Sequence, residues 1–246
     1  MSVLITGAAN GLGASIVSFA KARGHAVVGL DYQWRDETQD LEITADLSDP
    51  QSIAKLAPVL AAKGPYDVVV HNAAVSATGK FEEIPATAHE RLIDINVSSP
   101  LLLTKKLLAD GAIKQGGTLV FIASLSVYVG YPGAASYAAS KMAISNYAKS
   151  LRKALKGDGI NVLVVYPGPM KTDQASRHAP KGADAEKRMN SDDVAQQIFS
   201  AIDKRKSSLV PGATNKIFAK LGTLMPRTMR VMMKKIIYDK LDGSVY

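Results

Sequence analysis

The chain has 246 residues, of which 47% are hydrophobic and 21% charged, a composition that predicts a soluble globular protein. There are no cysteines, which excludes disulfides, thiolate metal sites and cysteine nucleophiles and suits a reducing cytoplasm. The net charge of +8 is concentrated in residues 203–246, which hold ten Lys or Arg against three Asp, so the body is nearly neutral and no nucleic-acid partner is expected.

No signal or transit peptide precedes the first apolar run, and no apolar run approaches the length of a membrane span. We therefore expect a cytoplasmic protein. The histidines are scattered among unrelated elements without metal-ligand spacing, so we expect no metal site.

Apolar runs alternate with helical patterns along the chain. Strands are predicted at residues 3–5, 26–30, 42–45, 67–71, 118–122, 161–165 and 208–212. Helices are predicted at residues 12–23, from 50 onward, at 88–111 with a bend at Pro100, at 136–156 and at about 190–202. The strands are near-continuous apolar runs, which is typical of a sheet covered on both faces. The pattern predicts a Rossmann-like, doubly wound parallel sheet in three α/β/α layers, with residues 1–246 as one domain.

Two segments after the sixth strand have their own character. Residues 173–190 are polar, and we expect a substrate lid loop. Residues 212–246 form a basic amphipathic helical tail, for which three interpretations stay open. The tail could pack on the body as a helical pair over the substrate cleft, form a subunit contact, or attach peripherally to an anionic membrane surface.

A glycine-rich turn links the first strand to the first helix. It contains Gly7, Asn10, Gly11, Leu12 and Gly13. In a parallel sheet this is where a ligand phosphate meets a helix N-terminus. Glycines allow the backbone to turn tightly and approach a pyrophosphate, and Gly13 allows the helix to pack against the strand. The turn therefore predicts a dinucleotide site.

Asp31 ends the second strand, 18 residues after Gly13. A carboxylate here can accept hydrogen bonds from ribose hydroxyls and would repel a 2′-phosphate, which favours NAD over NADP. Asn10 is uncharged, which agrees with this preference, whereas Arg35 lies close enough in the sequence to oppose it.

Tyr137 and Lys141 are four residues apart within a predicted helix, so they lie on one face. A phenol left alone titrates near pH 10, too high for exchange of protons at neutral pH. A nearby ammonium favours the phenolate, so we expect Lys141 to lower the pKa of Tyr137 and make it a general acid/base.

Together these motifs resemble the short-chain dehydrogenase/reductase family over about residues 2–172. The turn has the family's TGxxxGxG spacing, Tyr137 and Lys141 its YxxxK pair, and Ser124 lies the usual 13 residues before Tyr137. The other matching positions are Asp46, Leu47, Asn72, Ala73, Ala74, Asn96, Pro167, Gly168, Met170 and Thr172. His71 and Ala74 depart from the family's Asn-Asn-Ala-Gly segment.

The resemblance implies roles for these residues. Tyr137 would transfer the proton, Lys141 would hold the nicotinamide ribose, and Ser124 would fix the substrate oxygen. Asn96 would anchor a water of a proton relay. The remaining matching positions would bind the dinucleotide, with Thr172 and Met170 near the carboxamide. Ser126 is a rival to Ser124 because both would face one side of a strand, and His178 is expected to be a solvated loop residue rather than a substrate contact.

The expected function is therefore NAD-dependent oxidation of a secondary alcohol or reduction of its ketone. An NADP-linked carbonyl reductase and a non-catalytic dinucleotide sensor are the alternatives. The resemblance also implies a homodimer or homotetramer, formed through the helices at about 88–111 and 136–156.

Overall fold

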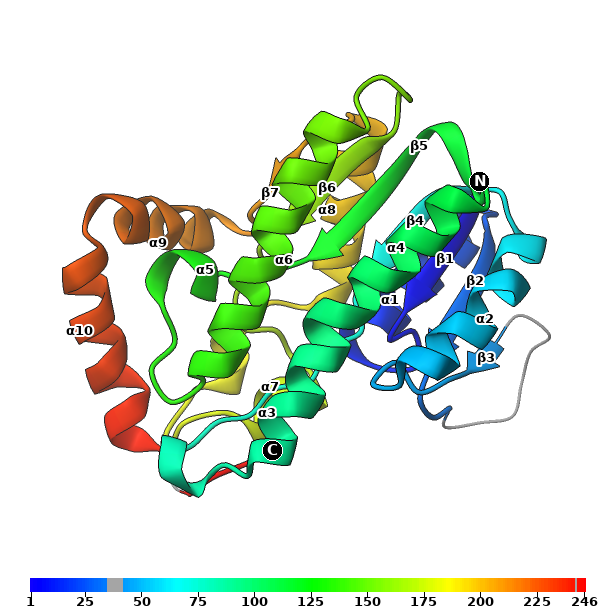
Figure 1. Ribbon diagram of the computed structural model, residues 1–246. Helices are drawn as coiled ribbons and strands as arrows, with labels where there is room; N and C mark the ends of the chain where they lie inside the picture. The colour runs from blue at the N-terminus through cyan, green and yellow to red at the C-terminus, as the bar shows by residue number, and fades with distance from the viewer. Residues whose placement is uncertain (35–41, 242) are drawn as a thin grey trace.

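The computed structural model describes residues 1–34, 42–241 and 243–246, and within them seven parallel strands form one sheet in the order β3-β2-β1-β4-β5-β6-β7 (Figure 1). The strands are β1 Ser2–Thr6, β2 Ala26–Asp31, β3 Glu42–Thr44, β4 Tyr66–His71, β5 Ile113–Ile122, β6 Asn161–Val165 and β7 Ser208–Leu209. The order reverses between β1 and β4, so a crevice opens at the carboxyl ends of these two strands. The predicted doubly wound parallel sheet is confirmed.

Helices cover both faces of the sheet. They are α1 Gly11–Ala22, α2 Pro50–Lys63, α3 Ala86–Ile93, α4 Ser99–Ala109, α5 Ser126–Val129, α6 Ala135–Ala154, α7 Asp173–Arg177, α8 Ser191–Asp203, α9 Ala213–Leu224 and α10 Pro226–Ile236. One core lies between the sheet and α2, α4 and α6, and the other lies between the sheet and α1 and α8. Successive strand residues alternate between them, with Leu4 and Val69 in the first core and Ile5 and Val70 in the second.

Several element boundaries differ from the predictions. The helix expected at residues 88–111 is divided into α3 and α4 by a π-helical turn at Asp94–Ser98, and Pro100 lies in the first turn of α4. A π turn adds a residue to the helical repeat and so bends the axis where Pro100 alone was expected to do so. The short helix α5 was not predicted, β5 begins five residues earlier than expected, and β7 is shorter than predicted.

The basic tail forms a helical hairpin of α9 and α10 that packs on α5. Leu125 and Val129 form a small apolar cluster with Ala219 and Met229 of the hairpin. The expectation that the tail packs on the body as a helical pair is confirmed. No helix among the described residues combines the length and hydrophobicity needed to cross a membrane.

Candidate active site

A cavity of about 1140 Å³ opens at the carboxyl end of the sheet. The predicted site residues that line it are Gly7, Asn10, Gly11, Leu12, Asp31, Asp46, Leu47, Asn72, Ala73, Ala74, Tyr137, Lys141, Pro167, Met170 and Thr172. These residues follow five different strands, and the parallel topology brings them to one edge. Ser124, Asn96, Gly13 and Gly168 do not line the cavity.

The glycine turn depends on close backbone approach. Gly7 and Gly11 have φ values of 66° and 53°, in the left-handed region that favours glycine. A Cβ atom on Gly7 would lie 2.8 Å from Ala73 Cα, and one on Gly13 would lie 1.8 Å from the Gly7 carbonyl oxygen. Asn72 Nδ2 donates to that same oxygen at 2.9 Å. Gly13 therefore sets the packing of α1 against β1, while Gly7 and Gly11 shape the cavity wall.

The N-terminus of α1 faces this cavity without a compensating negative charge. Asn10 is the N-cap residue, but its side chain makes no capping hydrogen bond, and the first turn contains no Asp or Glu. Gly11 and Leu12 of the same turn line the cavity. The partial positive charge of the helix end is thus available to an anion such as a pyrophosphate.

Two carboxylates lie at the adjoining end of the cavity. Asp31 Oδ2 accepts a hydrogen bond from the Ala9 backbone N–H at 2.9 Å, and its Oδ1 accepts one from the Tyr32 N–H at 2.7 Å. Asp46 accepts from the backbone N–H and the hydroxyl of Ser48. Burial on its own would raise the pKa of Asp46, but these hydrogen bonds and the charge of Arg91 hold it below its ordinary value.

Arg91 was not identified from the sequence. Its guanidinium lies 5.6 Å from the centre of the Tyr32 ring, and both residues line the cavity. Arg91 is on α3, far from Asp31 and Asp46 in the sequence, so only the fold places a cation at this end. Arg35, the cation that the sequence suggested here, lies outside the described residues.

Tyr137 and Lys141 project from one face of α6. Lys141 Nζ lies 5.7 Å from the Tyr137 ring centre and donates to the Ile122 carbonyl oxygen at 2.9 Å. Burial lowers the pKa of Lys141 to about 8. Burial also raises the pKa of Tyr137 to about 12, although a hydrogen bond with Ser124 lowers it in part. The expectation that Lys141 lowers the pKa of Tyr137 below its ordinary value is therefore wrong for this structure, because desolvation dominates both groups.

Ser124 follows β5 directly and shares a hydrogen bond with Tyr137. Its hydroxyl also accepts from the Ser126 backbone N–H at 3.2 Å. Ser126 is not on a strand, as the sequence suggested, but begins α5, and its buried hydroxyl has no partner among the described residues. The structure thus brings Ser124, and not Ser126, to Tyr137.

Asn96 lies in the π-helical turn and is 2% exposed. Its side chain accepts from the Val75 N–H and donates to the Val75 carbonyl oxygen, both at 2.9 Å. It also donates to Ser140 Oγ at 3.0 Å, and Ser140 donates to the Tyr137 carbonyl oxygen. Asn96 therefore joins the loop after β4 to the helix that carries Tyr137.

The loop after β6 forms another wall. Pro167, Met170 and Thr172 line the cavity, and Thr172 Oγ1 caps α7 by accepting from the Ala175 N–H at 3.2 Å. Gly168 has another role, because a Cβ atom there would lie 2.6 Å from the Asn215 side chain. Gly168 thus leaves room for the start of the tail.

The segment at 173–190 and the end of the chain meet across the cavity. His178 Nδ1 is 2.8 Å from Thr78 Oγ1, and Thr78 pairs with Val245 through two backbone hydrogen bonds of 2.8 Å. His178, Val245 and Tyr246 all line the cavity. The expectation of a solvated His178 is wrong, because the fold buries it partly against Thr78. Val245 and Tyr246 carry no motif, so the sequence offered no signal for them.

Comparison with known proteins supports a family assignment. The family model described as short chain dehydrogenase matches residues 1–183. Dehydrogenase/reductase SDR family member 7B of Rattus norvegicus is 29% identical over 234 residues, covering 85% of this chain and 72% of that protein. The 1-deoxy-11-beta-hydroxypentalenate dehydrogenase of Streptomyces exfoliatus is 32% identical over 221 residues, covering 82% and 79%.

Solved structures agree with this assignment. A short-chain dehydrogenase from Streptomyces avermitilis superposes with a TM-score of 0.78 at 27% identity, covering 96% of this chain and 97% of that one. Two others show the same fold below 25% identity. They are 4-hydroxyisoleucine dehydrogenase with NADH, with a TM-score of 0.75, 22% identity and coverage of 85% and 96%, and a Burkholderia cenocepacia short chain dehydrogenase with NADP, with a TM-score of 0.78, 19% identity and coverage of 94% and 96%.

Proposed function

The chain belongs to the short chain dehydrogenase family, whose members are oxidoreductases acting on CH–OH groups, and from this premise we propose that it is an NAD-linked oxidoreductase of a secondary alcohol or its ketone. The observation that carries the proposal is the cavity itself. One continuous space has the glycine turn and Asp31 at one end and Tyr137 with Lys141 at the other.

The residues of the cavity fit a nicotinamide dinucleotide. The uncapped N-terminus of α1 would hold the pyrophosphate, Asp31 the adenosine ribose, and Asp46 the adenine. Lys141 would donate to the nicotinamide ribose, and Thr172 with Met170 would lie against the carboxamide. The bound dinucleotide supplies the hydride, so the protein has to orient the substrate and move one proton.

Tyr137 is suited to give that proton. Because its pKa is about 12, the phenol is protonated at neutral pH and can donate to an oxygen that gains charge. Ser124 orients the phenol through their shared hydrogen bond. Lys141 carries its charge below pH 8 and, as the neighbouring cation, stabilises negative charge that develops on either oxygen.

Turnover with a panel of secondary alcohols and ketones, followed by nicotinamide absorbance, tests the proposal. Tyr137→Phe should lower kcat by at least about 100-fold while NADH binding changes less than about threefold. Tyr147→Phe on the same helix is the matched control and should keep full activity. Retained turnover in the Tyr137 variant would refute the assigned acid, and a wild-type protein that binds NADH without any turnover would favour the sensor alternative.

NADP is the second candidate cofactor, and Arg91 is the observation that favours it. A guanidinium beside the adenosine end could bind a 2′-phosphate, which Asp31 would repel. Titration with both cofactors decides between them. We expect NAD to bind at least about tenfold more tightly, and Asp31→Ser to reduce that ratio.

The expected homodimer or homotetramer belongs to this proposal, with α4 and α6 as the contact helices. The mass of the protein in solution, measured by light scattering, tests it. A monomeric mass would contradict it.

A further inference from the structure

The α9–α10 hairpin has an inner side that is fixed to the body. Ala219 and Met229 are buried against α5, and a Cβ atom on Gly222 would lie 2.4 Å from the Tyr128 carbonyl oxygen. The hairpin is thus held in one orientation. Its remaining side chains form an outer face, defined by Lys216, Ile217, Lys220, Leu221, Leu224, Met225, Arg227, Arg230, Val231, Lys234 and Lys235.

The outer face combines exposed apolar side chains with a single sign of charge. Ile217, Leu224 and Val231 are exposed by 60%, 67% and 60%, and Met225 at the hairpin turn by 51%. Residues 213–236 contain six Lys or Arg and no Asp or Glu. Large apolar side chains that a folded body leaves in water mark an interaction surface when they gather in one patch.

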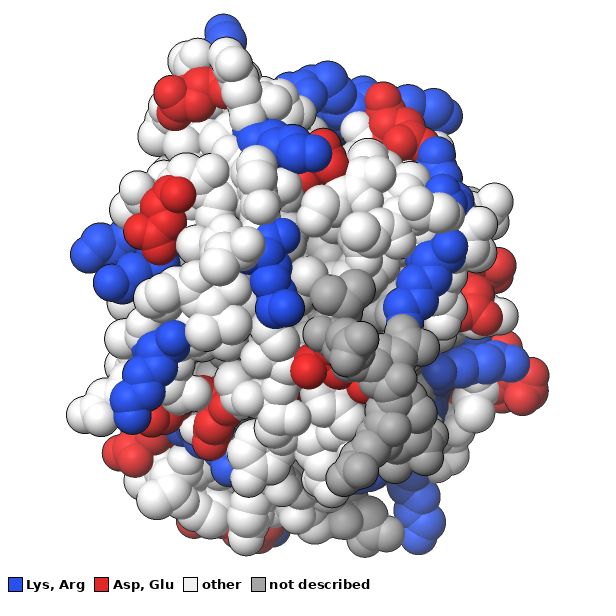
Figure 2. All heavy atoms as spheres, turned by 90° about the vertical axis from the view of Figure 1, so that its right-hand side faces the viewer, with Lys and Arg blue, Asp and Glu red and all other residues white. Residues whose placement is uncertain are grey.

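Most of the positive charge on this face is not neutralised by the protein. Lys234 pairs with Asp239 at 2.6 Å, but Lys216, Lys220, Arg227 and Lys235 make no hydrogen bond or ion pair with any residue that the structure describes. The face beyond β3 and α2 differs, since there blue and red side chains are interspersed (Figure 2). The outer face of the hairpin therefore carries an electrostatic bias that the other face does not.

We propose that the outer face of the α9–α10 hairpin binds the surface of an anionic lipid bilayer. Cations would meet the lipid headgroups, while Ile217, Leu224 and Val231 enter the boundary of the acyl chains. The charge on the face is complementary to anionic lipid, and the apolar residues between the cations find a partner there that water does not provide.

Other occupants fit this face less well. A two-fold contact with a second copy would set two positive faces against each other, because such an interface uses the same patch on both subunits. A nucleic acid would satisfy the cations through its phosphates but would leave the apolar side chains without a role.

Co-sedimentation of the full-length protein with vesicles tests the proposal. We expect binding to phosphatidylglycerol-containing vesicles at least about tenfold above binding to pure phosphatidylcholine vesicles, weakening as salt is raised. Replacing Lys216, Lys220, Arg227 and Lys235 by Gln should weaken binding on the order of 100-fold. The matched control replaces four exposed lysines elsewhere, Lys55, Lys63, Lys204 and Lys206, by Gln and should bind as wild type does.

A second variant separates lipid from the other partners. Ile217→Ser with Leu224→Ser keeps every charge and should still weaken vesicle binding about tenfold or more. Both sets of substitutions are at exposed positions, so thermal unfolding should be unchanged. The proposal is overturned if anionic vesicles do not bind the wild type, if the control variant loses as much binding, or if the apolar variant loses none. It is also overturned if that variant only lowers the oligomeric mass, because the face is then a subunit contact.

Discussion

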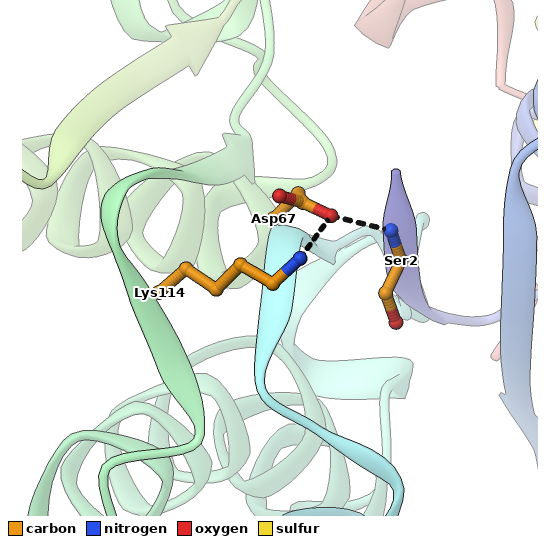
Figure 3. A network of polar contacts seen from close by, with 3 residues as sticks. All are labelled: Ser2, Asp67 and Lys114. Carbon is orange, nitrogen blue, oxygen red and sulfur yellow. Dashed lines mark hydrogen bonds and ion pairs between the residues drawn. The ribbon is translucent and has the colours of Figure 1, made fainter.

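The two ends of β4 treat charge in opposite ways. At the amino end Asp67 accepts from the Ser2 backbone N–H at 2.6 Å and from Lys114 Nζ at 2.8 Å (Figure 3). Burial on its own would raise the pKa of Asp67, but these two donors hold it below its ordinary value. At the carboxyl end His71 is fully buried, and burial lowers its pKa to about 3, so it is neutral.

The same contrast holds across the sheet. Where solvent reaches the amino end, an ion pair stabilises the charged form of a carboxyl group. Where the cavity excludes solvent, burial favours the neutral forms of Tyr137, Lys141 and His71. The difference indicates that desolvation tunes the candidate site more than paired charge does, and each prediction below tests one side of this comparison.

Lys141→Met should have the largest effect. It removes the cation beside Tyr137, so we expect kcat to fall by about 100-fold or more. Wild-type stability should rise by roughly 2 kcal/mol between pH 8 and pH 10, because the unfolded lysine still binds a proton there that the folded one has lost. Denaturant unfolding at both pH values measures this, and the variant should lack the rise. An identical rise in the variant would show that Lys141 is not its source.

His71→Gln tests the other buried group on the cavity side. Between pH 6.5 and pH 4 the unfolded histidine binds a proton that the folded one excludes, so wild-type stability should fall by roughly 3 kcal/mol as the pH is lowered. Glutamine can keep the hydrogen bond that His71 Nε2 shares with Thr104 Oγ1 at 2.9 Å. Its acid loss should therefore be smaller, as measured by urea unfolding at both pH values. Replacement of the exposed His89 by Gln should leave the wild-type profile unchanged.

Tyr246→Ala tests whether the end of the chain contributes to the cavity. Tyr246 lines the cavity but is 66% exposed, so we expect KM for the substrate to rise by about two- to fivefold with little change in NADH affinity. Steady-state kinetics with NADH titration measures both quantities. A change confined to NADH affinity would contradict a role at the substrate end.

Lys114→Met should have the smallest effect, because the pair with Asp67 is partly solvated. We expect a loss of less than about 1 kcal/mol at pH 7. The folded pKa of Asp67 is depressed, so this contribution is full above the ordinary carboxyl pKa and disappears as the pH falls through the folded value. Guanidinium unfolding at pH 7 and pH 3 measures it, with Lys55→Met as the control. A loss of equal size at both pH values would exclude the ion pair as its cause.

Local patterns were enough to predict the fold and most of the cavity. The apolar runs identified the core strands, because a strand buried on both faces must be apolar throughout. The glycine turn and the Tyr137–Lys141 spacing were readable for a similar reason, since each depends on residues close together in the chain. The separation of Ser124 from Tyr137 added a family signal that periodicity does not supply.

The residues that sequence reasoning missed come from distant segments. Arg91 reaches Tyr32 from α3, and Val245 reaches Thr78 from the end of the chain. No local pattern encodes such contacts, because they depend on how the sheet closes and where the tail folds back. The direction of the Tyr137 pKa shift was also wrong from the sequence, since spacing reveals a neighbouring charge but not the burial of both partners.

By itself the sequence determined the parallel sheet, the dinucleotide turn and the pair on α6, because these rest on hydrophobic period, glycine geometry and helical spacing. Only the tertiary structure decided which residues enclose the cavity, which groups are desolvated, and which side of the basic tail faces water. Burial and proximity between distant segments are properties of the packed chain, and they set both the chemistry at Tyr137 and the exposed face of the hairpin.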